Sequence, residues 1–333
     1  MTGPVLLRAT DVVKHFPLRA AGRRAEVRAV DGVSLDVYAG ETVGVVGESG
    51  CGKSTLGRCL VRLADLTSGT VEFDGHDITR LSRRALRPLR RDVQFVFQDP
   101  YASLNPRRRA GDIVAEPLVN YGIGDAASRA TRARELLEQV GLPGTAHERF
   151  AHEFSGGQRQ RLGIARALAL SPSLIVADEP VSALDVSVQA QILNLLADIR
   201  RDKGLAYLFV SHDLGVVEYI ADTVAVMYLG SIVERAPKAT FFAKPLHPYA
   251  QALVGSVPSL DPRRRRRHTL LQGDVPSAAA LPSGCRFRTR CPLAHARCAT
   301  EEPLLRAAAP DHFVACHAVT DASGVPSPGV HGV

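Results

Sequence analysis

The chain has no tryptophan, and phenylalanine and tyrosine bring its aromatic residues to only 5%. No apolar run approaches the ~20 residues that a helix needs to cross a bilayer, so we expect no transmembrane segment. The N-terminus has no basic stretch followed by an apolar one, so we expect no signal peptide either. A chain that stays in a reducing cytosol would keep its six cysteines out of disulfides.

The remaining composition is typical of a folded protein. Charged residues make up 23% and apolar residues 45% of the 333 residues, which is a globular and not a disordered balance. This length is enough for one large core and a small additional module. The net charge of +7 favours phosphate ligands or an anionic membrane surface, and by itself it does not distinguish these from nucleic acid.

The most informative stretch is a glycine-rich loop at residues 47–55, which fits the pattern G-x-x-x-x-G-K-[ST]. Glycines let backbone N–H groups surround phosphate oxygens, Lys53 would reach the β- and γ-phosphates, and the Ser54 hydroxyl would hold Mg²⁺. An apolar run at 42–46 predicts a strand before the loop, and residues 54–64 predict a helix whose N-terminus faces the phosphates. We therefore predict that ATP is bound by Gly47, Glu48, Ser49, Gly50, Cys51, Gly52, Lys53, Ser54 and Thr55.

The segments around the loop suggest two kinds of structure. Residues 5–16 and 26–46 alternate strands with polar turns, and Asp74-Gly75 is a hairpin signal after a short strand. Phe16 closes the first strand and is predicted to stack on the adenine ring. Between residues 99 and 170 the pattern becomes helical, with an amphipathic helix over 128–141 and another after Ser155, a good N-cap.

Continuous apolar runs at 42–46, 174–177 and 206–210 predict strands of a parallel sheet that is covered on both faces, and residues 93–97 predict another apolar strand. In such sheets ligands bind at the carboxyl ends of the strands. The three runs end in the glycine loop, in Asp178-Glu179 and in Ser211-His212, and the strand at 93–97 ends at Gln98. We therefore expect one nucleotide site at this edge of an α/β core.

Each of these strand-end residues has an expected role. Asp178 would hold Mg²⁺ together with Ser54 and Gln98, and Gln98 would also sense the attacking water. Glu179 would act as the general base. The catalytic set is completed by His212, which would contact the γ-phosphate, and by Lys53.

The segment Ser155-Gly-Gly-Gln158 completes a set of motifs that resembles the nucleotide-binding subunit of an ABC transporter. The set comprises the glycine loop, Gln98, this segment, residues 174–179, Ser182-Ala-Leu-Asp185 and His212, in the order of that family, and the resemblance covers about residues 5–235. Residues 98–107, 180–187, 247–249 and the terminal cysteines make the chain most similar to the F-type ATPase subunit of dipeptide or oligopeptide importers within the peptide and nickel importers. A small departure is Phe154 where the family more often has leucine.

This resemblance implies a fold, which is a P-loop NTPase cassette of the ABC type. Its RecA-like parallel-sheet core with N-terminal antiparallel strands would span residues 1–98 and 171–235, and its helical subdomain residues 99–170. The extension at 236–333, which includes five arginines at 263–267 expected on the surface, would be a small irregular cysteine-rich module.

The resemblance also implies partners and a function. Two cassettes would meet head to tail, so that the ATP of one is contacted by the partner's copies of Ser155, Gly156, Gly157, Gln158 and Asp185. The second cassette would be a homologous subunit, with a homodimer also open. The pair would work at the cytoplasmic face of the membrane with two integral membrane permease subunits, indirectly with an extracytoplasmic substrate-binding protein, and without nucleic acid.

The implied activity is ATP hydrolysis that powers uptake of di- or oligopeptides. The alternatives are an importer of nickel or another small solute, or a soluble ABC ATPase outside transport. A sensor that only binds ATP is a further reading, and Glu179 argues against it because a pure binder needs no general base.

The cysteines fall into two groups. Cys51 and Cys59 lie in and after the glycine loop and are expected to be small packing residues. The other four, spaced C-x5-C-x6-C-x17-C, favour a metal over disulfides, but the spacing matches neither common zinc nor ferredoxin patterns. The residues alone leave Zn²⁺, a [4Fe–4S] cluster and no metal open. The resemblance favours a structural [4Fe–4S] cluster on Cys285, Cys291, Cys298 and Cys316.

Overall fold

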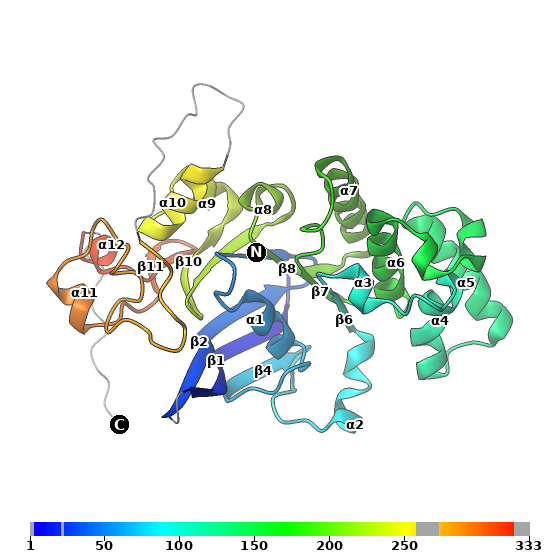
Figure 1. Ribbon diagram of the computed structural model, residues 1–333, viewed down its shortest axis with the longest axis horizontal. Coiled ribbons are helices and arrows are strands. Elements are labelled where there is room, and N and C mark those ends of the chain that lie inside the picture. Colours follow the sequence, from blue (N-terminus) through cyan, green and yellow to red (C-terminus); the bar gives the residue numbers. More distant parts are fainter. Residues whose placement is uncertain (1–2, 21–22, 258–272, 323–333) are drawn as a thin grey trace.

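The computed structural model describes residues 3–20, 23–257 and 273–322, and the arginine run at 263–267 lies outside these ranges. Its larger sheet has the strand order β11-β12-β10-β9-β3-β8-β7-β6 (Figure 1). The centre of this sheet is parallel and consists of β6 (Val93–Val96), β7 (Leu174–Asp178), β8 (Ala206–Ser211), β3 (Thr42–Val46) and β9 (Thr223–Tyr228). Every residue of β3, β7, β8 and β9 is buried, which confirms the prediction for the apolar runs at 42–46, 174–177 and 206–210.

The second sheet is antiparallel, with the order β2-β1-β4-β5. It consists of β1 (Val5–Ala20), β2 (Arg23–Tyr38), β4 (Ser68–Phe73) and β5 (His76–Asp77). The predicted hairpin is confirmed, because Asp74 and Gly75 both have positive φ angles, 48° and 72°, between the paired strands β4 and β5.

Helix α1 (Lys53–Leu60) lies between the two sheets and packs against β1, β2, β7 and β8. Its Leu56, Cys59 and Leu60 are fully buried, and Cys51 before it is buried too, as expected for packing residues. Burial raises the pKa of the Cys59 thiol to about 11. The helix ends earlier than predicted because the chain turns at Arg62, which has a φ of +55°.

The helical region lies at one end of the molecule (Figure 1). After α2 (Arg83–Leu86) and η1 (Leu89–Arg91) it contains α3 (Pro100–Ser103), α4 (Ala110–Tyr121), α5 (Ala126–Gln139), η2 (Gly144–Glu148), η3 (Ala151–Glu153) and α6 (Gly156–Leu168). Ser155 caps α6 as predicted, because its side chain accepts from the Gln158 N–H in a reciprocal capping box.

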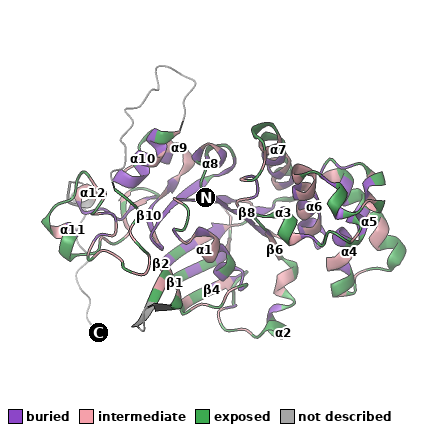
Figure 2. Ribbon diagram, viewed as in Figure 1, coloured by how far each residue is buried: buried purple, intermediate pink, exposed green. Residues whose placement is uncertain are grey.

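Two helices return the chain to the large sheet. Helix α7 (Val186–Lys203) ends at Gly204, which has a φ of +63°, and α8 (Leu214–Ile220) follows β8. Figure 2 shows that the inner faces of these elements are buried while their outer faces are exposed. None of the helices within the described ranges combines the length and apolar character that a membrane span requires.

The prediction of an irregular C-terminal extension is wrong. β10 (Ser231–Pro237) leads into α9 (Lys238–Ala243) and α10 (Pro248–Ser256), and the later part contains α11 (Ala296–Thr300), β11 (Arg306–Ala309), β12 (His312–Val314) and α12 (His317–Ala322). β12 pairs antiparallel with β10, so the extension continues the large sheet. These elements are too short to show a periodic pattern, which is why the sequence does not reveal them.

A buried glutamate ties the extension to the sheet. The Glu234 side chain on β10 has 0% exposure and accepts three hydrogen bonds. The donors are His312 Nε2 at 2.8 Å and the backbone N–H groups of Leu246 and His247 at 2.9 and 2.6 Å. A buried carboxyl must be hydrogen-bonded to be tolerated, so this group joins β10, β12 and the start of α10.

Candidate functional site

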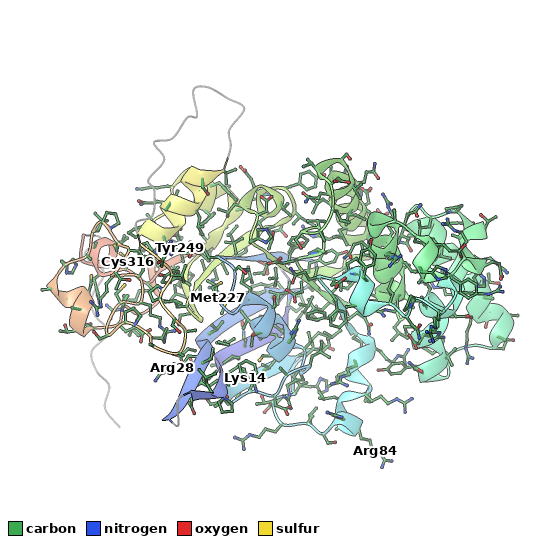
Figure 3. The ribbon with its side chains drawn as sticks, in the orientation of Figure 1. Lys14, Arg28, Arg84, Met227, Tyr249 and Cys316 are labelled. Atoms are coloured by element: carbon green, nitrogen blue, oxygen red, sulfur yellow. The ribbon has the colours of Figure 1, made fainter. Side chains whose placement is uncertain are left out.

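The glycine loop connects the buried strand β3 to α1. A Cβ atom at Gly52 would lie 1.9 Å from the Ala29 carbonyl oxygen, and one at Gly47 would lie 2.2 Å from that of Met227. Met227, labelled in Figure 3, is at the end of β9. Glycine is therefore required at both positions by the close approach of neighbouring backbone.

Lys53 occupies the inside of this loop. Its side chain is buried, and Nζ donates to the carbonyl oxygens of Gly47 at 2.8 Å and Glu48 at 3.0 Å. Nζ also lies 3.9 Å from Cys51 Sγ, and among the described residues no carboxylate forms an ion pair with it. The loop thus presents a cation to any anion that enters it.

Ser54 and Asp178 meet below the loop, as the sequence predicted from strand order. Ser54 Oγ donates to Asp178 Oδ1 at 2.6 Å, and the Asp178 side chain is 1% exposed. Burial raises the pKa of this carboxyl. Its Oδ2 accepts no hydrogen bond from the described residues, and the nearest cation is Arg58 at 3.8 Å. A hydroxyl beside a buried carboxylate oxygen that accepts no hydrogen bond is a donor set that fits Mg²⁺.

The other three strand-end residues also converge. Gln98 Nε2 donates to Glu179 Oε2 at 2.8 Å, and His212 Nδ1 lies 3.2 Å from the same oxygen. Glu179 has a φ of +46°, and its N–H donates to the Val210 carbonyl at 2.9 Å. A left-handed glutamate is strained by about 1–3 kcal/mol, and such strain is concentrated at functional sites.

A cavity of about 630 Å³ joins these groups. Most of its lining was predicted, namely eight loop residues with Gln98, Glu179 and His212; the others are Val27, Ala29, Leu253 and Ala278. Phe16 does not appear among the described residues that line it; its side chain is exposed on β1, with Lys14 Nζ 4.9 Å from the ring centroid. The additional residues come from β2 and the extension, and no sequence motif marks them.

The Ser155–Gln158 segment and Asp185 adjoin each other, away from this cavity. A Cβ at Gly156 would lie 3.6 Å from the Leu184 side chain, and one at Gly157 would lie 2.4 Å from Val188 at the start of α7. Within the described chain the Asp185 side chain makes no capping hydrogen bond to α7. The structure thus brings these residues together on one surface and does not bring them to the chain's own loop.

Within the described chain none of the four C-terminal cysteines forms a disulfide; three are buried and Cys291 is half-buried. Burial raises the pKa of the Cys285 thiol to about 11. In the part of the chain that the structure describes, no group of three or more His, Cys, Asp or Glu side chains is arranged to hold a metal ion. The predicted iron–sulfur or zinc site is therefore not supported. The segment is instead fastened by protein contacts, of which Arg290 to Glu48 of the loop is the most direct.

Comparisons with known proteins agree with this geometry. Residues 30–182 match a family model described as ABC transporter, and residues 233–298 match one described as Oligopeptide/dipeptide transporter, C-terminal region. The chain is 54% identical to a putative peptide import ATP-binding protein of Brucella ovis, over 95% of this chain and 98% of that one. It is 50% identical to the oligopeptide transport ATP-binding protein AppF of Bacillus subtilis, over 94% and 97%.

A solved structure is similar as well. The ATP-binding cassette MJ0796, described as a dimer in a post-hydrolysis state bound to ADP and Pi, superimposes with a TM-score of 0.64 at 30% identity, over 70% of this chain and 98% of that one. A second is cbiO1 from Clostridium perfringens, with a TM-score of 0.62 at 26% identity, over 72% and 91%. With relatives above half identity over almost its whole length and this fold, the chain belongs to the ATP-binding proteins of the ABC transporter family.

Proposed function

We propose that this protein hydrolyses ATP to power the import of di- and oligopeptides through partner membrane subunits. The observation that carries the proposal is the convergence of the glycine loop, Gln98, Glu179 and His212 on one cavity, with Ser54 and Asp178 beside it. The family match over the C-terminal region and the printed names of the relatives support peptides as the cargo, over nickel or another small solute.

Mg²⁺ would be held by Ser54 and Asp178, with Gln98 contributing from the neighbouring strand. When bound, it would neutralise charge on the β- and γ-phosphate oxygens. Asp178 Oδ2 supports this assignment, because it is buried, accepts no hydrogen bond from the described residues and has only the more distant Arg58 guanidinium to balance its charge. Lys53 would then exchange its contacts to loop carbonyls for the phosphates.

Glu179 would be the general base that takes a proton from the attacking water. Its carboxylate already receives the Gln98 amide and faces His212, so both would orient it. His212 would also contact the γ-phosphate. The strained backbone at Glu179 supports this role, since it aims the side chain into the cavity at a conformational cost.

The surface formed by the Ser155–Gln158 segment and Asp185 would close over the ATP of a second cassette. The N-terminus of the thirteen-residue helix α6 and the Ser155 hydroxyl would suit a γ-phosphate. The partner would be a homologous subunit or a second copy. The pair would sit at the cytoplasmic face of the membrane on two permease subunits, with the segment after Gln98 in contact with them.

We further propose that the four C-terminal cysteines bind a structural [4Fe–4S] cluster, with Zn²⁺ as the alternative. Two contacts support it: the Cys285 N–H donates to the Cys298 carbonyl at 2.9 Å, and the Leu293 N–H donates to Cys291 Sγ at 3.4 Å. Uptake would require the thiols to move together. Anaerobically purified protein should contain iron and acid-labile sulfide, whereas a colourless zinc-containing sample would reject the cluster.

The test of the transport function uses the assembled complex. Co-purification with the membrane subunits, followed by identification of the bound solute, should recover short peptides and peptide-stimulated ATP hydrolysis. A complex that hydrolyses ATP but carries nickel chelates would assign the alternative cargo. ATP hydrolysis with no membrane partner at all would favour a soluble ABC ATPase.

A further inference from the structure

The phosphate loop contains a carboxylate at its second residue. Glu48 lines the cavity, and its side chain is 27% exposed. A negative charge at this place would repel the phosphates of a nucleotide, by an amount that grows as the site loses water. The loop therefore needs either to turn Glu48 away or to neutralise it.

Arg290 supplies the neutralising charge. Its Nη1 donates to Glu48 Oε2 at 2.8 Å and its Nη2 to Oε1 at 3.1 Å, in the two-pronged geometry that suits a guanidinium and a carboxylate. The Arg290 side chain is only 6% exposed, so solvent screens this pair weakly. The hydrogen bond to Glu48 raises the pKa of Arg290, which stays charged at all physiological pH.

A second residue of the extension holds the backbone at the same place. The Tyr249 hydroxyl accepts from the Glu48 N–H at 2.8 Å, and the Glu48 carbonyl accepts from Lys53 at 3.0 Å. Glu48 is thus fixed through its amide, its carbonyl and its carboxylate. Two of the three partners lie more than 200 positions away, at separations of 201 and 242 residues.

These two partners stand on a rigid support. Tyr249 packs against Tyr228 of β9 and Phe287, with ring centroids 4.7 and 5.5 Å apart, and all three rings are fully buried. Four residues before Arg290, Arg286 donates to the Leu229 carbonyl at 2.7 Å and to Asp31 at 2.8 Å. Figure 3 shows Tyr249 and Cys316 at the end of the molecule formed by the C-terminal elements.

We propose that Arg290 and Tyr249 form a loop clamp through which the C-terminal extension sets the affinity of the phosphate loop for ATP. Both are positioning residues: Arg290 neutralises Glu48 and Tyr249 fixes its amide, and neither reaches the reacting atoms. The inference rests on the proposed function, because it takes the loop to bind ATP. Since coupling between two sites is reciprocal, bound ATP stabilises the segment around Arg290 in return.

The experiment measures the dissociation constant of MgATP by calorimetry for the full chain and for variants at Glu48, Arg288 and Arg290. Arg290→Ala should weaken ATP binding about ten-fold or more, because it leaves the Glu48 carboxylate uncompensated beside the phosphates. Arg290→Lys, which keeps the charge but not the fork, should fall between. The matched control is Arg288→Ala, from the same segment; its side chain contacts Ser283 and not the loop. It should bind ATP within about two-fold of the unsubstituted chain.

The decisive variant is the double replacement Glu48→Gln with Arg290→Ala. Removing the carboxylate should restore most of the affinity lost in Arg290→Ala, whereas a general weakening of the fold would persist in the double variant. Equal affinity of Arg290→Ala and the unsubstituted chain, or additive effects in the double variant, would overturn the clamp. A chain that binds no ATP before any substitution would instead refute the proposed function. If Arg290→Ala fails to fold, the comparison of Arg290→Lys with and without Glu48→Gln decides in the same way.

Discussion

The two parts of the nucleotide cavity are built differently. Parallel strands deliver the loop, Gln98, Glu179 and His212 to one edge of the sheet, so strand order alone brings this chemistry together. Leu253 and Ala278 reach the same cavity from the extension, which also supplies Arg290 to the loop. That part depends on contacts between distant residues. The comparison separates the groups that would cut ATP from those that would hold the loop in place, and substitutions can test the separation.

The largest effect on activity is expected for the residues at the ends of the parallel strands. Glu179→Gln should lower ATP turnover by roughly 100-fold or more, because it removes the proposed base, while ATP binding persists. Steady-state phosphate release measures the turnover, and equilibrium ATP binding measures the affinity. Glu148→Gln, an exposed glutamate paired with Arg109 in the helical region, is the control and should turn over normally. Unchanged hydrolysis in Glu179→Gln would show that Glu179 is not the general base.

Substitutions in the C-terminal extension should change the stability of the folded protein. Glu234→Ala would leave three buried donors without their acceptor, which we expect to cost about 3 kcal/mol or more of unfolding free energy. Denaturant unfolding measures this. Glu301→Ala is the control, because its pair with Arg297 is half exposed and should contribute little to stability. A loss in Glu234→Ala no larger than in the control would show that the extension is held by other contacts.

Low pH should destabilise the same region through His247. This residue is buried, and burial lowers its pKa to about 3 from an ordinary value near 6.5. Below pH 6.5 the unfolded chain takes up a proton that the folded chain does not, so the folded state loses up to about 1.4 kcal/mol per pH unit down to pH 3. His247→Asn keeps an acceptor for the Tyr249 N–H and should flatten this slope. Parallel pH profiles for the two proteins would contradict the assignment.

The smallest expected effect compares two glycines of α6. Gly163 has open space where a methyl group would lie, with no atom within 4 Å of that position, so Gly163→Ala should stabilise the chain by about 0.5–1 kcal/mol. A Cβ at Gly157 would lie 2.4 Å from Val188, so Gly157→Ala should destabilise it. Thermal unfolding of both variants distinguishes the signs. The same sign for both would mean that the contact between α6 and α7 is not as tight as described.

Most of the residues at the strand ends could be predicted, because the sequence patterns that mark them are local. The pattern at 47–55 is contiguous, the apolar runs mark buried strands, and Asp178, Glu179 and His212 come directly after such runs. Parallel pairing then places their ends together without knowledge of side-chain packing. The Ser155 cap and the Asp74-Gly75 hairpin were predictable for the same reason.

The extension could not be predicted in this way. β12 has three residues, and its partner β10 lies 78 positions away at the Glu234–His312 contact. No sequence pattern distinguishes Arg290 from the other arginines; only the fold shows that it contacts Glu48. The stacking role of Phe16 stays a prediction: the residue is exposed on β1, and the sequence alone does not show how its ring lies relative to a nucleotide. Side-chain placement of this kind depends on tertiary contacts that single-sequence patterns do not encode.

The most direct test of the account is an experimental structure of the Glu179→Gln variant with MgATP. The account predicts phosphates enclosed by the Gly47–Thr55 loop, Mg²⁺ on Ser54, and a second cassette whose Ser155–Gln158 segment covers the γ-phosphate. Nucleotide bound elsewhere, or in the loop with Gln98, Asp178 and His212 all turned away from it, would contradict the account.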